Sequence, residues 1–156
     1  MNVRAKRSSG FSLIELVIVV VIIAIIGAIA IPKMSRGAQG ASDSALIQNL
    51  SVLRSALDLY QTENGGAYPT VANVTNALLQ YNDGNGGLSA TKTGNFVYGP
   101  YLRSVPTLPV GAAKGSNGIA ATTAAGIGWI YTAATGSITA NTTTEADAKG
   151  VAYNTY

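Results

Sequence analysis

The chain has 156 residues, of which 11% are charged and 47% are hydrophobic. This length suits one domain with an appendage, and the composition disfavours disorder. Cysteine and histidine are both missing, which excludes disulfide bonds, thiolate metal sites and imidazole chemistry. The net charge of +3 comes from Arg4, Lys6 and Arg7, because basic and acidic residues are equal in number after them. Nucleic-acid binding through a basic folded domain is therefore not expected.

The first predicted element is a helix long enough to cross a membrane. Residues 11–31 form a run of 21 residues whose only polar members are Ser12 and Glu15. At about 1.5 Å per residue the helix is roughly 31 Å long, which matches the hydrocarbon core of a bilayer. Because the basic residues precede the run, the N-terminus is predicted to stay in the cytoplasm and the bulk of the chain to be exported.

Two kinds of processing fit this N-terminus. An ordinary signal peptide would be cleaved after Ala30, at an Ala-Ile-Ala site, and would release a soluble binding module. That interpretation gives Glu15 no role, although an acidic residue at the centre of a bilayer costs about 2.5–3.5 kcal/mol. In the other interpretation the apolar run is retained on the mature protein.

A motif at the start of the run resembles the class III signal of type IV pilins and type II secretion pseudopilins. It reads GFSLIEL over residues 10–16, behind a short basic leader. The resemblance implies that a prepilin peptidase cuts between Gly10 and Phe11 and methylates the new N-terminus at Phe11. It also implies that Glu15 pairs with the N-terminal amine of a neighbouring subunit, which relieves an unfavourable charge in a low-dielectric helix.

This resemblance divides the chain into segments. Residues 1–10 are the cleaved leader, and residues 11–31 are the transmembrane and filament-core helix. Residues 32–66 contain a hinge and an amphipathic helix, and residues 67–156 form a globular head.

The predicted hinge follows the membrane segment directly. Pro32 removes a helix hydrogen bond, and Gly37 and Gly40 each weaken a helix by about 1 kcal/mol relative to alanine. Many pilins carry a proline at the corresponding place. We therefore expect these three residues to let the helix bend or loosen.

The amphipathic helix is predicted from apolar residues spaced by three and four positions. They form one stripe: Ala45, Leu46, Leu50, Leu53, Leu57 and Tyr60. Ser42 or Asp43 is expected to cap the first turn. The spacing of Arg54 and Asp58 predicts an ion pair. The stripe is expected to pack against the head.

The head is predicted to hold a β-hairpin. Strands at residues 127–132 and 137–140 are joined by a turn that contains Gly136. Residues 95–98 are a weaker strand candidate, and residues 74–81 are predicted to form a short helix. The predicted fold class is α+β, with a long N-terminal helix packed on a small antiparallel sheet.

Two longer segments of the head are predicted to be exposed loops. Residues 111–126 and 141–150 are rich in small and polar side chains. Major pseudopilins commonly bind calcium in a loop near the C-terminus. Calcium takes about six to eight oxygen ligands, several of them carboxylates, and only Glu145 and Asp147 are nearby. A solvated loop without metal or cofactor is therefore expected, with Ca²⁺ in this loop as the alternative.

Two further segments are similar to those of major pseudopilins in particular. NGGAYPT, at residues 64–70, resembles their turn after the long helix, and GPYL, at residues 99–102, resembles a segment ahead of their sheet. In adhesive pilins two cysteines near the C-terminus delimit the receptor-binding loop, and this chain has no cysteine. The resemblance thus favours a type II secretion pseudopilus subunit, with a type IV pilin for adhesion, motility or DNA uptake as the alternative.

The leading hypothesis is a structural subunit without enzymatic activity, since the acidic residues show no spacing typical of an acid/base pair. It predicts a single-pass inner-membrane precursor with a periplasmic head, which later joins a periplasmic or extracellular helical filament. The implied partners are further copies of the chain, prepilin peptidase, an inner-membrane platform with its ATPase, and minor pilins or pseudopilins.

Overall fold

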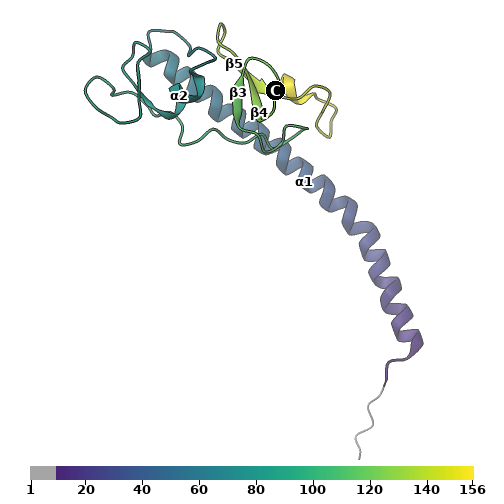
Figure 1. Ribbon diagram of the computed structural model, residues 1–156. Helices are drawn as coiled ribbons and strands as arrows, with labels where there is room; N and C mark the ends of the chain where they lie inside the picture. Colours follow the sequence, from purple (N-terminus) through teal and green to yellow (C-terminus); the bar gives the residue numbers. More distant parts are fainter. Residues whose placement is uncertain (1–9) are drawn as a thin grey trace, which may run out of the picture. The chain divides into compact units, whose positions relative to one another are not determined.

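The computed structural model describes residues 10–156 (Figure 1). The chain divides into two compact units, of which the first ends at Ala38 and the second begins at Gln39. Helix α1 (Leu13–Glu63) contributes to both units. The basic residues Arg4, Lys6 and Arg7 of the predicted leader lie outside the described residues.

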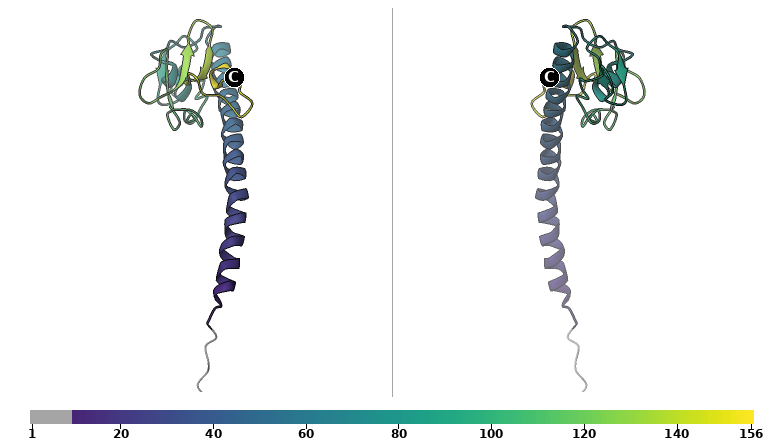
Figure 2. Two further views of the ribbon diagram at one scale, coloured as in Figure 1. Left: turned by 90° about the vertical axis from the view of Figure 1, so that its right-hand side faces the viewer. Right: turned by 90° about the vertical axis from the view of Figure 1, so that its left-hand side faces the viewer.

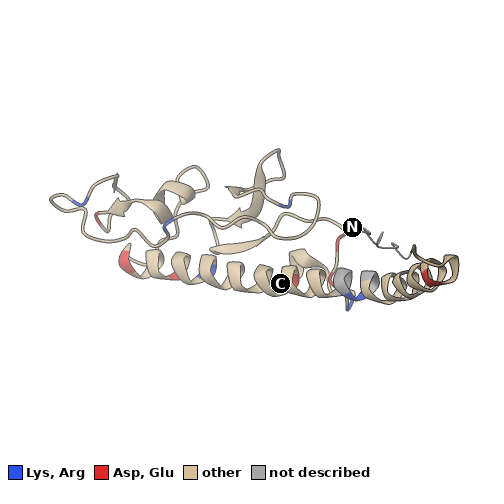
Figure 3. Cartoon of the chain, turned by 90° about the horizontal axis from the view of Figure 1, so that it is seen from below, with Lys and Arg blue, Asp and Glu red and all other residues tan. Residues whose placement is uncertain are grey.

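The described part of the first unit is dominated by the N-terminal part of α1. The window Leu13–Ala30 has a mean hydropathy of 3.2, and none of it is buried. Residues 16–30 carry no acidic or basic side chain, as the charge colouring in Figure 3 illustrates. Length and composition therefore make this segment a candidate membrane span.

In the second unit, the C-terminal part of α1 lies beside the strands of a small sheet (Figure 2). Most side chains of α1 that face the core belong to the predicted stripe. They are at most 5% exposed: Leu46, Leu50, Leu53, Leu57 and Tyr60. Ala45 of the predicted stripe is only partly buried, whereas Ala56, outside it, is 5% exposed and belongs to the core. The stripe is therefore confirmed from Leu46 onward, where burial follows its spacing of three and four residues.

The remaining elements are short. After α1 come the helix α2 (Val74–Leu79) and the strands β1 (Tyr81–Asn82), β2 (Leu88–Ser89), β3 (Gly118–Ala120), β4 (Ile127–Thr132) and β5 (Ser137–Ala140), and then the 3₁₀ helix η1 (Tyr153–Thr155). β1 and β2 form an antiparallel pair. The larger sheet has the order β3-β4-β5. The predicted hairpin is its β4-β5 pair, in which Thr132 faces Ser137.

The α+β architecture is confirmed, but three details of the head differ from the prediction. The helix predicted over residues 74–81 ends at Leu79, and Tyr81 belongs to β1. β3 forms inside the predicted loop 111–126 and pairs parallel to β4, so the sheet is mixed. Residues 95–98 do not form a strand, because Phe96 and Val97 donate local hydrogen bonds to Thr93 and Asn95. Only an isolated bridge between Asn82 and Tyr98 remains.

The predicted contacts of Ser42, Asp43 and Arg54 in the amphipathic helix are not the ones that the structure shows. Neither Ser42 nor Asp43 caps a helix, since α1 is already helical before them. Asp43 instead accepts a hydrogen bond from the Tyr153 hydroxyl at 2.7 Å. Arg54 donates to the main-chain oxygens of Ile138 and Tyr156 and forms no ion pair with Asp58. These contacts fasten the C-terminal segment to α1.

Candidate functional site

The predicted processing site precedes the first turn of α1. Gly10 and Phe11 lie before the helix, and the Phe11 side chain is 85% exposed. A Cβ atom at Gly10 would meet nothing within 4 Å. Packing in the described structure therefore does not require a glycine at this position, and cleavage after Gly10 stays a prediction.

Glu15 lies in the first turn of α1 and caps its own helix. Its Oε2 atom accepts a hydrogen bond of 2.8 Å from the main-chain N–H of Ser12. Serine at the cap with glutamate three residues later is the capping-box arrangement, and a negative charge is also favoured at a helix N-terminus. The Ser-x-x-Glu spacing of residues 12–15 is the signal in the sequence that could have predicted this bond. Pairing of Glu15 with the amine of another subunit concerns a different contact. That pairing stays a prediction.

The apolar segment Leu13–Ala30 contacts almost nothing within the described chain. Its large side chains are between 45% exposed, at Val17, and 82% exposed, at Leu13. Surface of this kind is unfavourable in water and marks a membrane or protein interface. The segment therefore needs lipid, or apolar surface from other molecules, around it.

The predicted hinge residues all lie within α1. Pro32, Gly37 and Gly40 are in helical conformation, and the boundary between the two compact units falls after Ala38. A Cβ atom at Gly37 or Gly40 would meet nothing within 4 Å, so packing does not require either glycine. Bending or loosening at these residues stays a prediction.

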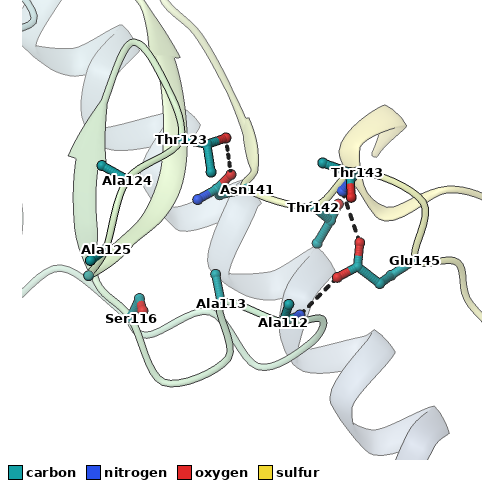
Figure 4. Close-up of a pocket in the computed structure, with 11 residues that line it drawn as sticks. Ala112, Ala113, Ser116, Thr123, Ala124, Ala125, Asn141, Thr142, Thr143 and Glu145 are labelled. Carbon is teal, nitrogen blue, oxygen red and sulfur yellow. Dashed lines mark hydrogen bonds between the residues drawn. The ribbon is translucent and has the colours of Figure 1, made fainter.

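The calcium alternative concerns the loop after β5, where Glu145 joins two loops beside a cavity of about 400 Å³ (Figure 4). Its Oε1 atom accepts a hydrogen bond from the N–H of Ala112 at 2.9 Å. Its Oε2 atom accepts bonds from the N–H groups of Thr143 at 2.9 Å and Thr144 at 3.1 Å. The bond from Ala112 is the largest of the contributions that lower the pKa of Glu145 to about 2.

Asp147 is held in the same manner. Its Oδ1 atom accepts hydrogen bonds of 2.8 Å from the N–H groups of Lys149 and Val151. Its Oδ2 atom accepts one of 2.6 Å from the Tyr156 hydroxyl, which is the main cause that lowers the pKa of Asp147. The same bond raises the pKa of Tyr156 to about 12. Both carboxylates of this loop are therefore occupied by hydrogen-bond donors.

A calcium ligand set does not fit this arrangement. Within residues 10–156 no group of three or more His, Cys, Asp or Glu side chains is placed to hold a metal ion. Calcium sites need several carboxylate or carbonyl oxygens that converge on one point. The oxygens of Glu145 and Asp147 converge on N–H and O–H groups instead.

The low pKa of Glu145 predicts that folding depends on pH. Its folded-state pKa of about 2 lies below its ordinary value of 4.5, so the carboxylate stabilises the fold above pH 4.5 and this contribution is lost as the pH falls toward 2. Replacing Glu145 by glutamine should therefore make stability less dependent on pH in this window. The measurement is thermal unfolding at a series of pH values.

An exposed carboxylate provides the control for this prediction. Asp58→Asn changes a side chain on the solvent side of α1 for which the described structure gives no side-chain hydrogen bond. This variant should keep the wild-type pH profile. An unchanged profile in the Glu145→Gln variant would contradict the stabilising role of the carboxylate.

Comparisons with known proteins agree with the N-terminal motif. The family described as "Prokaryotic N-terminal methylation motif" matches residues 5–31. The chain is 27% identical over 107 residues to the type II secretion system core protein G of Klebsiella pneumoniae, which covers 69% of this chain and 72% of that protein. No solved structure gives a significant match. The chain thus carries a prepilin-type N-terminal methylation motif, has a pilin-like α+β architecture and is similar to a type II secretion system core protein.

Proposed function

We propose that the chain is a structural subunit of a type IV pilus-like filament, and specifically of a type II secretion pseudopilus. The observation that carries this proposal is the segment Leu13–Ala30, an 18-residue apolar surface with no burial inside the chain. It lies within the N-terminal methylation motif. Bundling such helices from many copies would remove their apolar surface from both water and lipid.

The proposed pathway begins in the inner membrane. The apolar segment anchors the precursor with its N-terminus in the cytoplasm and its head in the periplasm. Prepilin peptidase removes residues 1–10 and methylates Phe11. Subunits then leave the membrane for the filament, moved by an inner-membrane platform and its ATPase, and minor pseudopilins join the same assembly. The similarity to a type II secretion core protein supports this choice of machinery.

Glu15 would have two successive partners in this pathway. In the isolated chain its carboxylate accepts a hydrogen bond from Ser12. Cleavage after Gly10 creates a cationic amine on Phe11, and in a filament the Phe11 amine of a neighbouring copy can pair with Glu15. A charged pair in a low-dielectric environment is strong enough to compete with a single hydrogen bond to a neutral N–H.

The processing step is tested by substituting the glycine before the cut. Gly10→Val should leave the leader attached and prevent filament formation, because the peptidase would lose its recognition residue. Immunoblots with an antibody against the head would detect the longer precursor. For cleavage alone, Gly37→Ala is the matched control, since Gly37 lies outside the leader and is also an exposed glycine with open space around it. Normal shortening of the Gly10→Val chain would contradict the proposed cut.

The assembly step is tested by isolating filaments. Cells that produce the chain together with a type II secretion apparatus should yield filaments made of this subunit, visible by electron microscopy. A chain recovered only as soluble monomer in the periplasm would contradict the proposal. Filaments formed only with surface-pilus machinery would assign the chain to a surface pilus instead.

A further inference from the structure

In the C-terminal loop, residues 141–151, main-chain N–H groups occupy most of the acceptor sites of the Glu145 carboxylate. Three N–H groups donate to it, one to Oε1 and two to Oε2, and a carboxylate has about four lone-pair sites. Bidentate binding of calcium would therefore displace at least one of these bonds and leave its donor without a partner. Leaving such donors without partners is unfavourable.

Glu145 also connects segments that are distant in the sequence. Its side chain holds Ala112, in the loop before β3, and its main-chain oxygen accepts a hydrogen bond of 3.1 Å from the N–H of Tyr153 in η1. The carboxylate therefore joins the loop before β3 to the loop after β5, and the same residue holds the start of η1.

Close approach of the two loops is visible at Gly111. This residue has a φ of +71°, and a Cβ atom there would lie 2.7 Å from Thr142 Cγ2 and 3.3 Å from Glu145 Oε1. A larger residue would push the two loops apart. The glycine thus allows the main chain before Ala112 to reach the carboxylate.

Asp147 holds the rest of the segment through hydrogen bonds. The N–H of Asp147 donates to the main-chain oxygen of Val151 at 2.9 Å, and the Asp147 carboxylate accepts from the N–H of Val151 at 2.8 Å. A bridge between Ala146 and Ala152 continues this pairing. The turn is therefore held by its own main chain and one carboxylate.

We propose that the Glu145 carboxylate joins these two loops by itself, so that the head folds without a divalent cation. The carboxylate links the loops at residues 111–116 and 141–146 through main-chain hydrogen bonds. The proposal concerns folding of the unit that begins at Gln39, and it does not rest on the proposed filament function.

The test measures thermal unfolding of the full chain in detergent, with Trp129 fluorescence as the signal. One sample contains EGTA and the other contains about 5 mM CaCl₂, which exceeds the dissociation constants of roughly 10⁻⁴–10⁻³ M typical of extracellular calcium modules. The melting temperature should be the same in both samples, because a cation that does not bind the folded state cannot stabilise it. A calcium-dependent rise of several degrees, absent with MgCl₂, would overturn the proposal.

The second arm tests the carboxylate itself. Glu145→Gln should lower the melting temperature by several degrees in both EGTA and calcium, since an amide cannot accept all three main-chain N–H bonds with the strength of a carboxylate. Asp58→Asn, on the solvent side of α1, should leave it unchanged. A melting temperature equal to wild type in the Glu145→Gln chain would overturn the proposal. The calcium arm uses the unaltered chain, so it decides the matter even if this variant does not fold.

Discussion

Replacing Glu15 by alanine is expected to abolish filament assembly while cleavage after Gly10 continues. The change removes the negative charge that would pair with the Phe11 amine of a neighbouring copy and leaves that amine unpaired. A hydrogen bond to a charged group contributes about 1.5–3 kcal/mol, which corresponds to about a 10- to 100-fold increase in the subunit concentration needed for assembly. Filament yield and precursor cleavage would be measured in the same cells.

A glutamine variant separates the two contacts of Glu15. The amide oxygen of Glu15→Gln can still accept the hydrogen bond from Ser12, which the glutamate accepts at 2.8 Å, but the side chain carries no charge. If charge pairing drives assembly, this variant should fail as alanine does. Wild-type filament yield from Glu15→Gln would show that the helix cap alone is needed and would contradict the pairing.

The largest expected effect on folding comes from Leu53→Ala. The Leu53 side chain is completely buried and belongs to the core between α1 and the sheet. Truncating a buried leucine removes apolar contact and leaves a cavity, which together cost about 2–5 kcal/mol. The free energy of unfolding would be measured by urea titration of the full chain in detergent, with the fully buried Trp129 as the fluorescent reporter.

Leu59 provides the matched control on the same helix. It lies six residues after Leu53 and is 49% exposed, so Leu59→Ala should change the unfolding free energy by less than about 0.5 kcal/mol. Equal losses in the two variants would mean that the packed face of α1 has been assigned wrongly. If Leu59 contacts another subunit in the filament, its substitution would affect filament yield without affecting folding.

The parts of the fold that could be predicted depend on short-range patterns. The buried stripe of α1 follows from leucines three and four residues apart, of which Leu50 and Leu53 are at most 1% exposed. The hairpin follows from two apolar runs around a turn with Gly136, whose φ of +68° suits a residue without a side chain. Each of these two signals lies within one short stretch of the chain, so it can be read directly from the sequence.

The parts that were predicted wrongly depend on distant partners. β3 has only Ile119 as a large buried side chain, and it becomes a strand because β4 pairs with it. Residues 95–98 have the opposite character, with high strand propensity but little burial, since Val97 is 49% and Tyr98 39% exposed. Strand propensity reflects packing on a half-buried surface, so it is a weak guide where that surface is missing.

In the candidate site, too, local contacts could be predicted from the sequence and contacts between distant residues could not. The bond between Ser12 and Glu15 is a local pattern, and the sequence contains everything needed to predict it. The contacts of Glu145 could not be predicted, because Ala112 lies 33 residues away and donates through its main chain. A main-chain N–H group is present in every residue except proline, so the residue types do not indicate which one will donate. The sequence therefore indicated Glu145 only as one of two acidic residues in a predicted loop.

The most direct test of the account is the N-terminus of the mature chain. Protein would be recovered from the membranes of cells with active prepilin peptidase, and its intact mass and N-terminal sequence determined. A subunit that assembles through its N-terminal helix should begin with methylated Phe11 and retain the apolar segment Leu13–Ala30. A mature chain that begins at Ile31 would contradict this expectation, because the helix proposed to hold the filament together would have been removed.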